Sequence, residues 1–151
     1  MRRQSGFALV EILLVLGILV LIAGLGLLMS MDVYRSYARR SERDAIVSVL
    51  QRARSRALAN VSQSTWGACY SGSEYIVFRG ATYANAQADV RVSANPAIII
   101  TDTSAPKKFA CTDGGISFMQ LTGDASSTSM TIKQGVSTST ISTNLEGTII
   151  W

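Results

Sequence analysis

The chain has 151 residues, which is enough for one membrane helix and one small domain. It contains no histidine, so the usual general base and the commonest metal ligand are both absent. No glycine-rich phosphate-binding loop of the P-loop or dinucleotide type occurs, and Asp113-Gly114-Gly115 suits a turn. The composition therefore argues against an enzyme and implies no cofactor and no metal site.

The net charge of +4 is concentrated in the first third of the chain. Residues 32–56 carry seven arginines and only three acidic residues. From residue 62 onward five cations stand against six anions, so that part is nearly neutral. The basic character thus belongs to the N-terminal third rather than to the C-terminal part.

Residues 7–29 form an apolar run in which Glu11 is the only ionisable side chain. The run is longer than the roughly 20 apolar residues that cross a bilayer core as a helix. The summed insertion free energy of its apolar residues outweighs the cost of one glutamate near its start. We therefore expect a transmembrane helix over residues 7–29. A carboxylate in such a helix needs a partner, which makes Glu11 a candidate functional residue.

A short basic leader, the pair Gly6-Phe7 and three apolar residues precede Glu11. This arrangement resembles the N-terminal signal of type IV pilins and pseudopilins. The resemblance implies cleavage between Gly6 and Phe7 by a membrane prepilin peptidase, with residues 1–6 as the leader peptide and Phe7 as an N-methylated terminus. It also implies that Glu11 pairs with the N-terminal amine of a neighbouring subunit during assembly. A conventional secretory signal and an ordinary signal anchor are the competing interpretations.

The orientation of this segment is indicated by two opposing features. Arginines are more numerous after the apolar run than before it, which by itself favours a cytoplasmic C-terminus. However, a pilin-type leader must face the cytosol to be cut, and a Ser/Thr-rich tail with two cysteines is typical of an exported domain. We expect a single pass through the inner or cytoplasmic membrane, with residues 61–151 outside the cytoplasm. The subunit would then enter a periplasmic or cell-surface filament.

Residues 30–60 continue the helical pattern, because apolar side chains recur at spacings of three and four from Val33 to Val61. No proline interrupts the pattern before Pro96. We expect an amphipathic continuation of the transmembrane helix. Its basic residues suit a solvated helix face with local ion pairs, such as Arg40 with Asp44 at i,i+4 spacing.

Two other anion contacts are open to the basic residues, namely lipid headgroups next to the bilayer and the phosphates of DNA. No aromatic-rich groove accompanies the cluster, so contact with DNA ranks below the other two interpretations. The candidate residues for such contacts are Arg35, Arg39, Arg40, Arg43, Lys107 and Lys108.

After Asn60 the composition changes to serine, threonine, glycine and strand-forming residues. Short runs predict strands at 66–70, 75–79, 90–93, 98–101, 116–121, 130–133, 138–142 and 148–151. Alternation in S-M-T-I-K-Q and T-S-T-I-S-T indicates one buried and one polar face, as in antiparallel sheets. We expect an α+β fold, in which a long N-terminal helix packs on a small antiparallel β-sheet domain over residues 61–151.

The two cysteines, Cys69 and Cys111, both lie in the predicted exported domain. In an oxidising compartment an even pair suggests one disulfide. Two buried free thiols are the alternative.

Three later stretches extend the resemblance to pilins. The helix end L-Q-R-A-R-S-R-A-L-A-N over 50–60, the strand W-G-A-C-Y and the closing E-G-T-I-I-W resemble minor pseudopilins of the GspH/FimT type. Arg56 departs from the pattern, since an acidic residue is common in that stretch. The resemblance implies a structural subunit, either a minor pilin or a pseudopilin, of a type II secretion or type IV pilus filament. Its implied partners are other subunits, the prepilin peptidase, the inner-membrane assembly platform and membrane lipid. A DNA-binding minor pilin for DNA uptake and a major pilin of the shaft are the alternatives.

Overall fold

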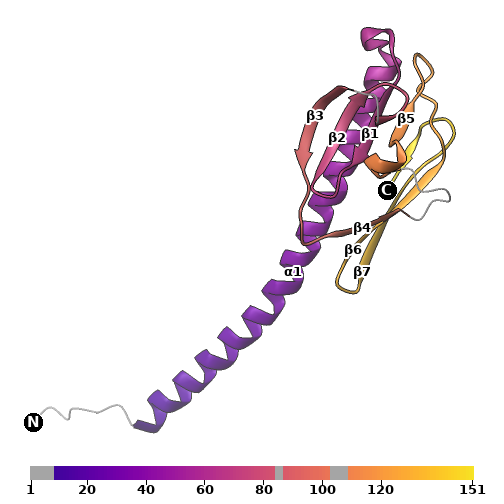
Figure 1. The fold of residues 1–151 in the computed structure, drawn as a ribbon. Coiled ribbons are helices and arrows are strands. Elements are labelled where there is room, and N and C mark those ends of the chain that lie inside the picture. The colour runs from indigo at the N-terminus through magenta and orange to yellow at the C-terminus, as the bar shows by residue number, and fades with distance from the viewer. Residues whose placement is uncertain (1–8, 84–86, 103–108) are drawn as a thin grey trace, which may run out of the picture. The chain divides into compact units, whose positions relative to one another are not determined.

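The computed structural model describes residues 9–83, 87–102 and 109–151. The chain divides into a first unit, Met1–Tyr37, and a second unit, Ala38–Trp151, and each is considered by itself. Helix α1 (Leu9–Leu58) provides the described part of the first unit and the first element of the second. The strands all belong to the second unit (Figure 1).

Helix α1 ends two residues before the predicted boundary. Asn60 has the left-handed backbone angles φ 54 and ψ 34, which asparagine tolerates better than most residues. The last turn closes through hydrogen bonds from the Ala59 and Asn60 amides to the carbonyls of Ser55 and Ala57. A short 3-10 helix, η1 (Val61–Gln63), then leads into the first strand.

The strands form two four-stranded sheets in which every neighbouring pair is antiparallel. The first sheet has the order β3-β2-β1-β5, with β1 (Trp66–Tyr70), β2 (Glu74–Arg79), β3 (Gln87–Ser93) and β5 (Ile116–Phe118). The second sheet has the order β4-β6-β7-β8, with β4 (Ile99–Asp102), β6 (Thr128–Gln134), β7 (Ser137–Thr143) and β8 (Ile149–Ile150). The predicted α+β class, a helix packed on antiparallel sheets, is confirmed.

Strand β5 is shorter than the predicted run of 116–121. It ends at Phe118 because the next residues turn back toward the helix end. The Met119 amide donates to the Asp124 carbonyl, and the Leu121 amide donates to the Ala57 carbonyl at 2.9 Å. Leu121 has a φ of 67°, which no strand can contain.

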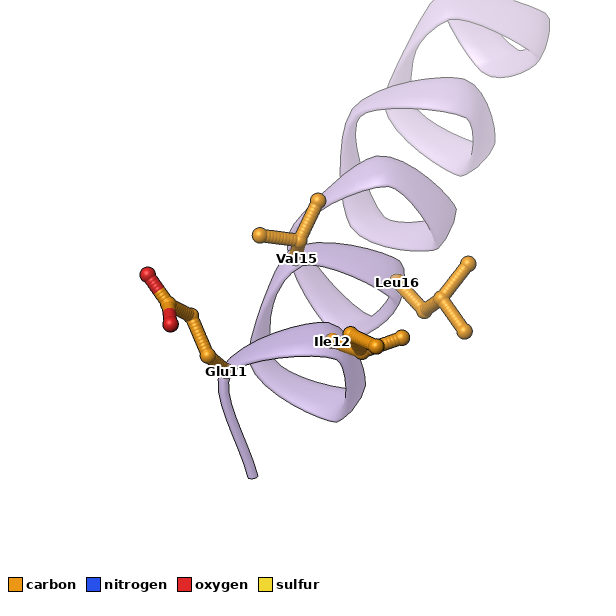
Figure 2. A pocket seen from close by; sticks show the side chains of 4 residues that line it. All are labelled: Glu11, Ile12, Val15 and Leu16. Carbon is orange, nitrogen blue, oxygen red and sulfur yellow. The ribbon is translucent and has the colours of Figure 1, made fainter. Parts of the chain in front are cut away.

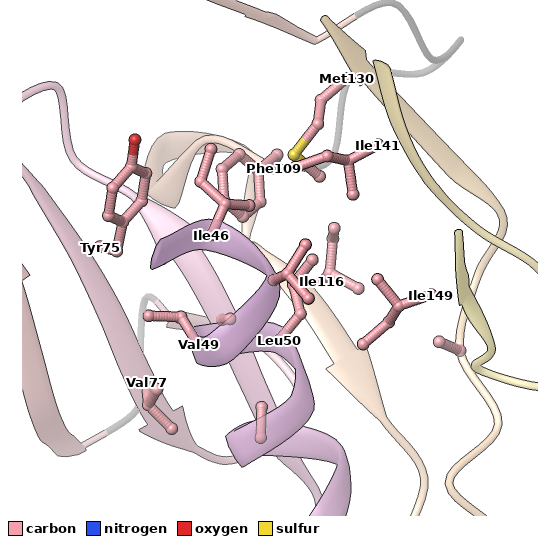
Figure 3. Packing of buried hydrophobic residues seen from close by; sticks show 14 of the residues in the cluster. Ile46, Val49, Leu50, Tyr75, Val77, Phe109, Ile116, Met130, Ile141 and Ile149 are labelled. Atoms are coloured by element: carbon pink, nitrogen blue, oxygen red, sulfur yellow. The ribbon is translucent and has the colours of Figure 1, made fainter. Parts of the chain in front are cut away.

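The main core lies between helix α1 and both sheets. On the helix, Ile46, Leu50 and Ala53 have no exposed surface, and their spacing of three and four residues places them on one face. Figure 3 shows Ile46, Val49 and Leu50 among buried side chains that come from both sheets. The sheet side chains are Tyr75, Val77, Ile116, Met130, Ile141 and Ile149, and Phe109 joins them from the segment before η3. The helical segment of the second unit thus packs its buried face against side chains from both sheets.

A second, smaller core lies on the other face of the first sheet. Cys69, Ile76 and Phe78 are buried there, with Tyr83 and Cys111 packed against them. Strands β1 and β2 are therefore buried on both faces and show no hydrophobic alternation in sequence. Cys69 and Cys111 form a disulfide, which ties β1 to the short 3-10 helix η3 (Cys111–Asp113).

Candidate functional site

The described helix of the first unit is apolar and exposed. The segment Leu9–Gly26 is long and apolar enough to cross a membrane, and none of it is buried. Leu14 is 62% exposed and Leu21 is 68% exposed. A helix that is hydrophobic all round needs an apolar environment, which a lipid bilayer or neighbouring apolar helices provide. A membrane anchor and a signal sequence both have this character.

Glu11 lies in the first turn of helix α1. Figure 2 shows its carboxylate directed away from the helix, beside a shallow depression of about 210 Å³ lined by Ile12, Val15 and Leu16. The position near a helix N-terminus favours a negative charge, because the unsatisfied amides carry partial positive charge. No described residue donates a hydrogen bond to this carboxylate or forms an ion pair with it. In lipid, therefore, its partner must come from beyond the described residues.

Four of the predicted site residues lie outside the described residues. They are Gly6 and Phe7 at the predicted cleavage bond and the basic pair Lys107 and Lys108.

The basic residues of helix α1 are placed in different environments. Arg35 and Arg40 are exposed, whereas Arg39 and Arg43 are half-buried. The predicted ion pair between Arg40 and Asp44 is wrong. The Asp44 carboxylate instead accepts from Nη2 of Arg43 at 2.8 Å and from Nε at 3.0 Å, because the adjacent guanidinium presents two donors side by side.

Arg56, the departure from the pseudopilin pattern, attaches the helix end to the first sheet. Its guanidinium pairs with the carboxylate of Asp89 on β3. The same guanidinium lies 4.7 Å from the ring centroid of Trp66 on β1, within the range of a cation–π interaction. A cation at this position therefore has two partners in the folded chain, and an acidic residue would have neither.

Glu42 is a buried carboxylate that sequence reasoning missed. It is 6% exposed, and its Oε1 accepts from the Tyr75 hydroxyl at 2.5 Å and from the Asn95 amide at 3.1 Å. Burial, and next the hydrogen bond to Glu42, raise the pKa of Tyr75 far above its usual range, so the hydroxyl keeps its proton and donates. Glu42 thereby links the helix to β2 and to the turn after β3. The one signal of this burial in the sequence is spacing. Glu42 precedes Ile46 by four residues, which places both on the same face of the helix.

Tyr75→Phe is expected to destabilise the second unit by about 1–3 kcal/mol, because it leaves the buried Glu42 carboxylate with one fewer donor. The matched control is Tyr70→Phe, since the Tyr70 hydroxyl donates to the exposed carbonyl of Gly72 and water can replace it. Chemical denaturation of the full chain in detergent, followed by tryptophan fluorescence, measures both variants, because unfolding exposes the buried Trp66. Equal midpoints for the two variants would show that the contact with Glu42 contributes nothing to stability.

No protein-family model, no curated protein and no solved structure matches this chain. An apolar N-terminal helix followed by a long helix packed on antiparallel sheets is nevertheless a pilin-like architecture. The disulfide between Cys69 and Cys111 indicates that the second unit matures outside the reducing cytoplasm.

Proposed function

We propose that the chain is a structural subunit of a type II secretion or type IV pilus filament, in the role of a minor pilin or pseudopilin, and that it is not an enzyme. The observation that carries the proposal is Glu11, an isolated carboxylate on an exposed apolar helix. Selection for membrane anchoring alone gives no reason for this charge, since it opposes insertion. A partner in the membrane gives such a reason.

The neighbouring subunit supplies that partner. If the leader is removed at Gly6, the new amine at Phe7 is a cation four residues before Glu11 in the same apolar segment. A subunit whose Glu11 meets this amine forms an ion pair in a medium of low dielectric constant, where each charge alone is costly. The apolar depression beside Glu11, formed by Ile12, Val15 and Leu16, suits contact with another apolar helix.

The second unit fits the exported part of such a subunit. Its disulfide favours an oxidising compartment, and its helix and two sheets share one hydrophobic core. The resemblance of residues 50–60 to minor pseudopilins is the reason for naming a minor role first, and a main shaft subunit would need the same helix. The assembly platform and the prepilin peptidase are the further partners that this role requires.

Processing provides the first test. In cells that contain the prepilin peptidase, we expect mass spectrometry of the membrane-extracted protein to find an N-methylated Phe7 at the terminus. Gly6→Val should leave the leader in place, because cleavage requires an unhindered backbone at that bond. Ser5→Ala, one residue away, is the matched control and should be processed normally. An intact Met1 terminus in the unmodified protein would contradict the proposal.

A further inference from the structure

A groove of about 300 Å³ lies in the second unit between the last turns of helix α1 and strand β8. The helix contributes Arg54, Ser55 and Leu58 to its walls, and the end of the chain contributes Ile149 and Trp151. At 3.6 residues per turn, the helix residues that line the groove lie on the opposite side of helix α1 from Glu42. The groove is therefore separate from the buried contact of Glu42. Its lining combines one cation with apolar and aromatic side chains.

Arg54 differs from Arg56, the other half-buried arginine in the last turns of helix α1. Arg43 and Arg56 each bind a carboxylate, whereas no described acidic side chain pairs with Arg54. Nη2 of Arg54 donates to the Glu146 carbonyl at 3.1 Å, which holds the guanidinium in place. Its Nε is buried beside the backbone of Gly147 and has no hydrogen-bond partner, so an occupant of the groove cannot reach this atom. The guanidinium lines the groove and is held in place, and no described carboxylate neutralises its positive charge, so it attracts an anionic group such as a carboxylate.

The apolar walls add a second requirement for the occupant. Leu58 is 43% exposed and Trp151 is 55% exposed, although both line a concave surface. Covering such side chains removes apolar area from water, which favours binding. Tryptophan and arginine are also the residues most often found at the energetic centres of interfaces.

Strand β8 indicates the backbone form of the occupant. It pairs with β7 on one side, and in the described part of the chain no strand pairs with its other edge. An unpaired edge beside a groove suits an extended peptide, whose backbone can hydrogen-bond to it. Nucleic acid fits less well, because the groove has one cation and a phosphate backbone is bound through several.

We propose that this groove binds an extended peptide segment of another protein, with a carboxylate on Arg54 and an adjacent apolar side chain between Leu58 and Trp151. The proposal is independent of filament assembly, since processing at Gly6 and pairing of Glu11 concern the first unit alone. Failure of one proposal therefore leaves the other intact.

The test uses the full chain in detergent micelles and the probe acetyl-Val-Asp-Leu-Val amide. Trp66 is 3% exposed, so quenching of tryptophan fluorescence by iodide reports mainly on Trp151. We expect the probe to protect Trp151 from quenching in a saturable way. The same peptide with asparagine in place of aspartate should bind about tenfold more weakly, which corresponds to the loss of one charge-assisted contact.

Two serine variants on the same helix test whether the probe binds in the groove or elsewhere on the surface. Ser55→Glu places a competing carboxylate beside Arg54, so the probe should bind to this variant at least about tenfold more weakly. Ser48→Glu is the matched control, because Ser48 is exposed, lies outside the groove lining and makes the same hydroxyl contact three residues back. It should bind the probe like the unmodified chain.

Any one of five results would overturn the proposal, and four of them concern added ligands. They are no saturable protection by the probe, equal binding of the aspartate and asparagine peptides, equal binding to the Ser55→Glu variant, and stronger protection by a single-stranded oligonucleotide. Concentration-dependent protection of Trp151 without any peptide would likewise overturn it, by assigning the groove to a second copy of the chain.

Discussion

Glu11→Ala is expected to leave membrane insertion intact and to lower filament incorporation at least about tenfold, since about 1.4 kcal/mol of lost pairing already corresponds to a factor of ten. The variant removes a charge from an apolar segment, so insertion itself becomes easier. It also removes the carboxylate that we propose to pair with the neighbouring amine. Carbonate extraction of membranes measures insertion, and immunoblotting of sheared filaments measures incorporation.

The control for Glu11→Ala is Leu16→Ala, because Leu16 lines the same depression but carries no charge. Truncating it removes apolar contact area only, so a much smaller loss of incorporation is expected. Glu11→Gln separates charge from size and should behave like Glu11→Ala. Incorporation of Glu11→Ala at the level of the unmodified protein would remove the support for charge pairing.

Gly147→Ala is expected to destabilise the second unit by about 2–5 kcal/mol, from left-handed backbone strain and overpacking together. Gly147 has a φ of 69°, and a Cβ built on it would lie 1.9 Å from the carbonyl oxygen of Gly123. The obstacle is backbone, so no side-chain rotation can relieve the overlap. Thermal and chemical unfolding of the full chain in detergent measure the effect.

Gly135→Ala is the matched control for this substitution. Gly135 has a similar φ of 59° in the turn between β6 and β7, and nothing lies within 4 Å of a Cβ built there. Its cost is therefore the backbone strain alone, about 1–2 kcal/mol. If both variants lose the same stability, the close approach of Gly123 and Gly147 does not limit the packing of the two turns.

Much of the candidate site in the first unit could be predicted from sequence. A single glutamate stands out against a long apolar run, because hydropathy and charge are properties of each residue and need no tertiary contact. The partner of Glu11 could not be predicted in the same way, since no described residue provides one. Cys69 and Cys111 could be named as a possible pair, while the bond itself depended on β1 and η3 lying together.

The side-chain contacts of the second unit were harder to predict from the sequence. Glu42 lies in the polar stretch S-E-R-D, where nearest neighbours suggest a solvated face. Its burial follows from the position of Tyr75, 33 residues away. Arg56 appeared as an exception until Asp89 and Trp66 were seen to meet it.

The sequence by itself determined the helix, the existence of most strands and the α+β class, because each of these follows from a local period of apolar residues. Only the tertiary structure decided the pairing of β1 with β5 and of β4 with β6, the burial of Glu42, and the groove beside Arg54. A local period specifies which face of an element is buried. It does not specify which distant element covers that face, because such contacts depend on register and packing among segments far apart in the chain.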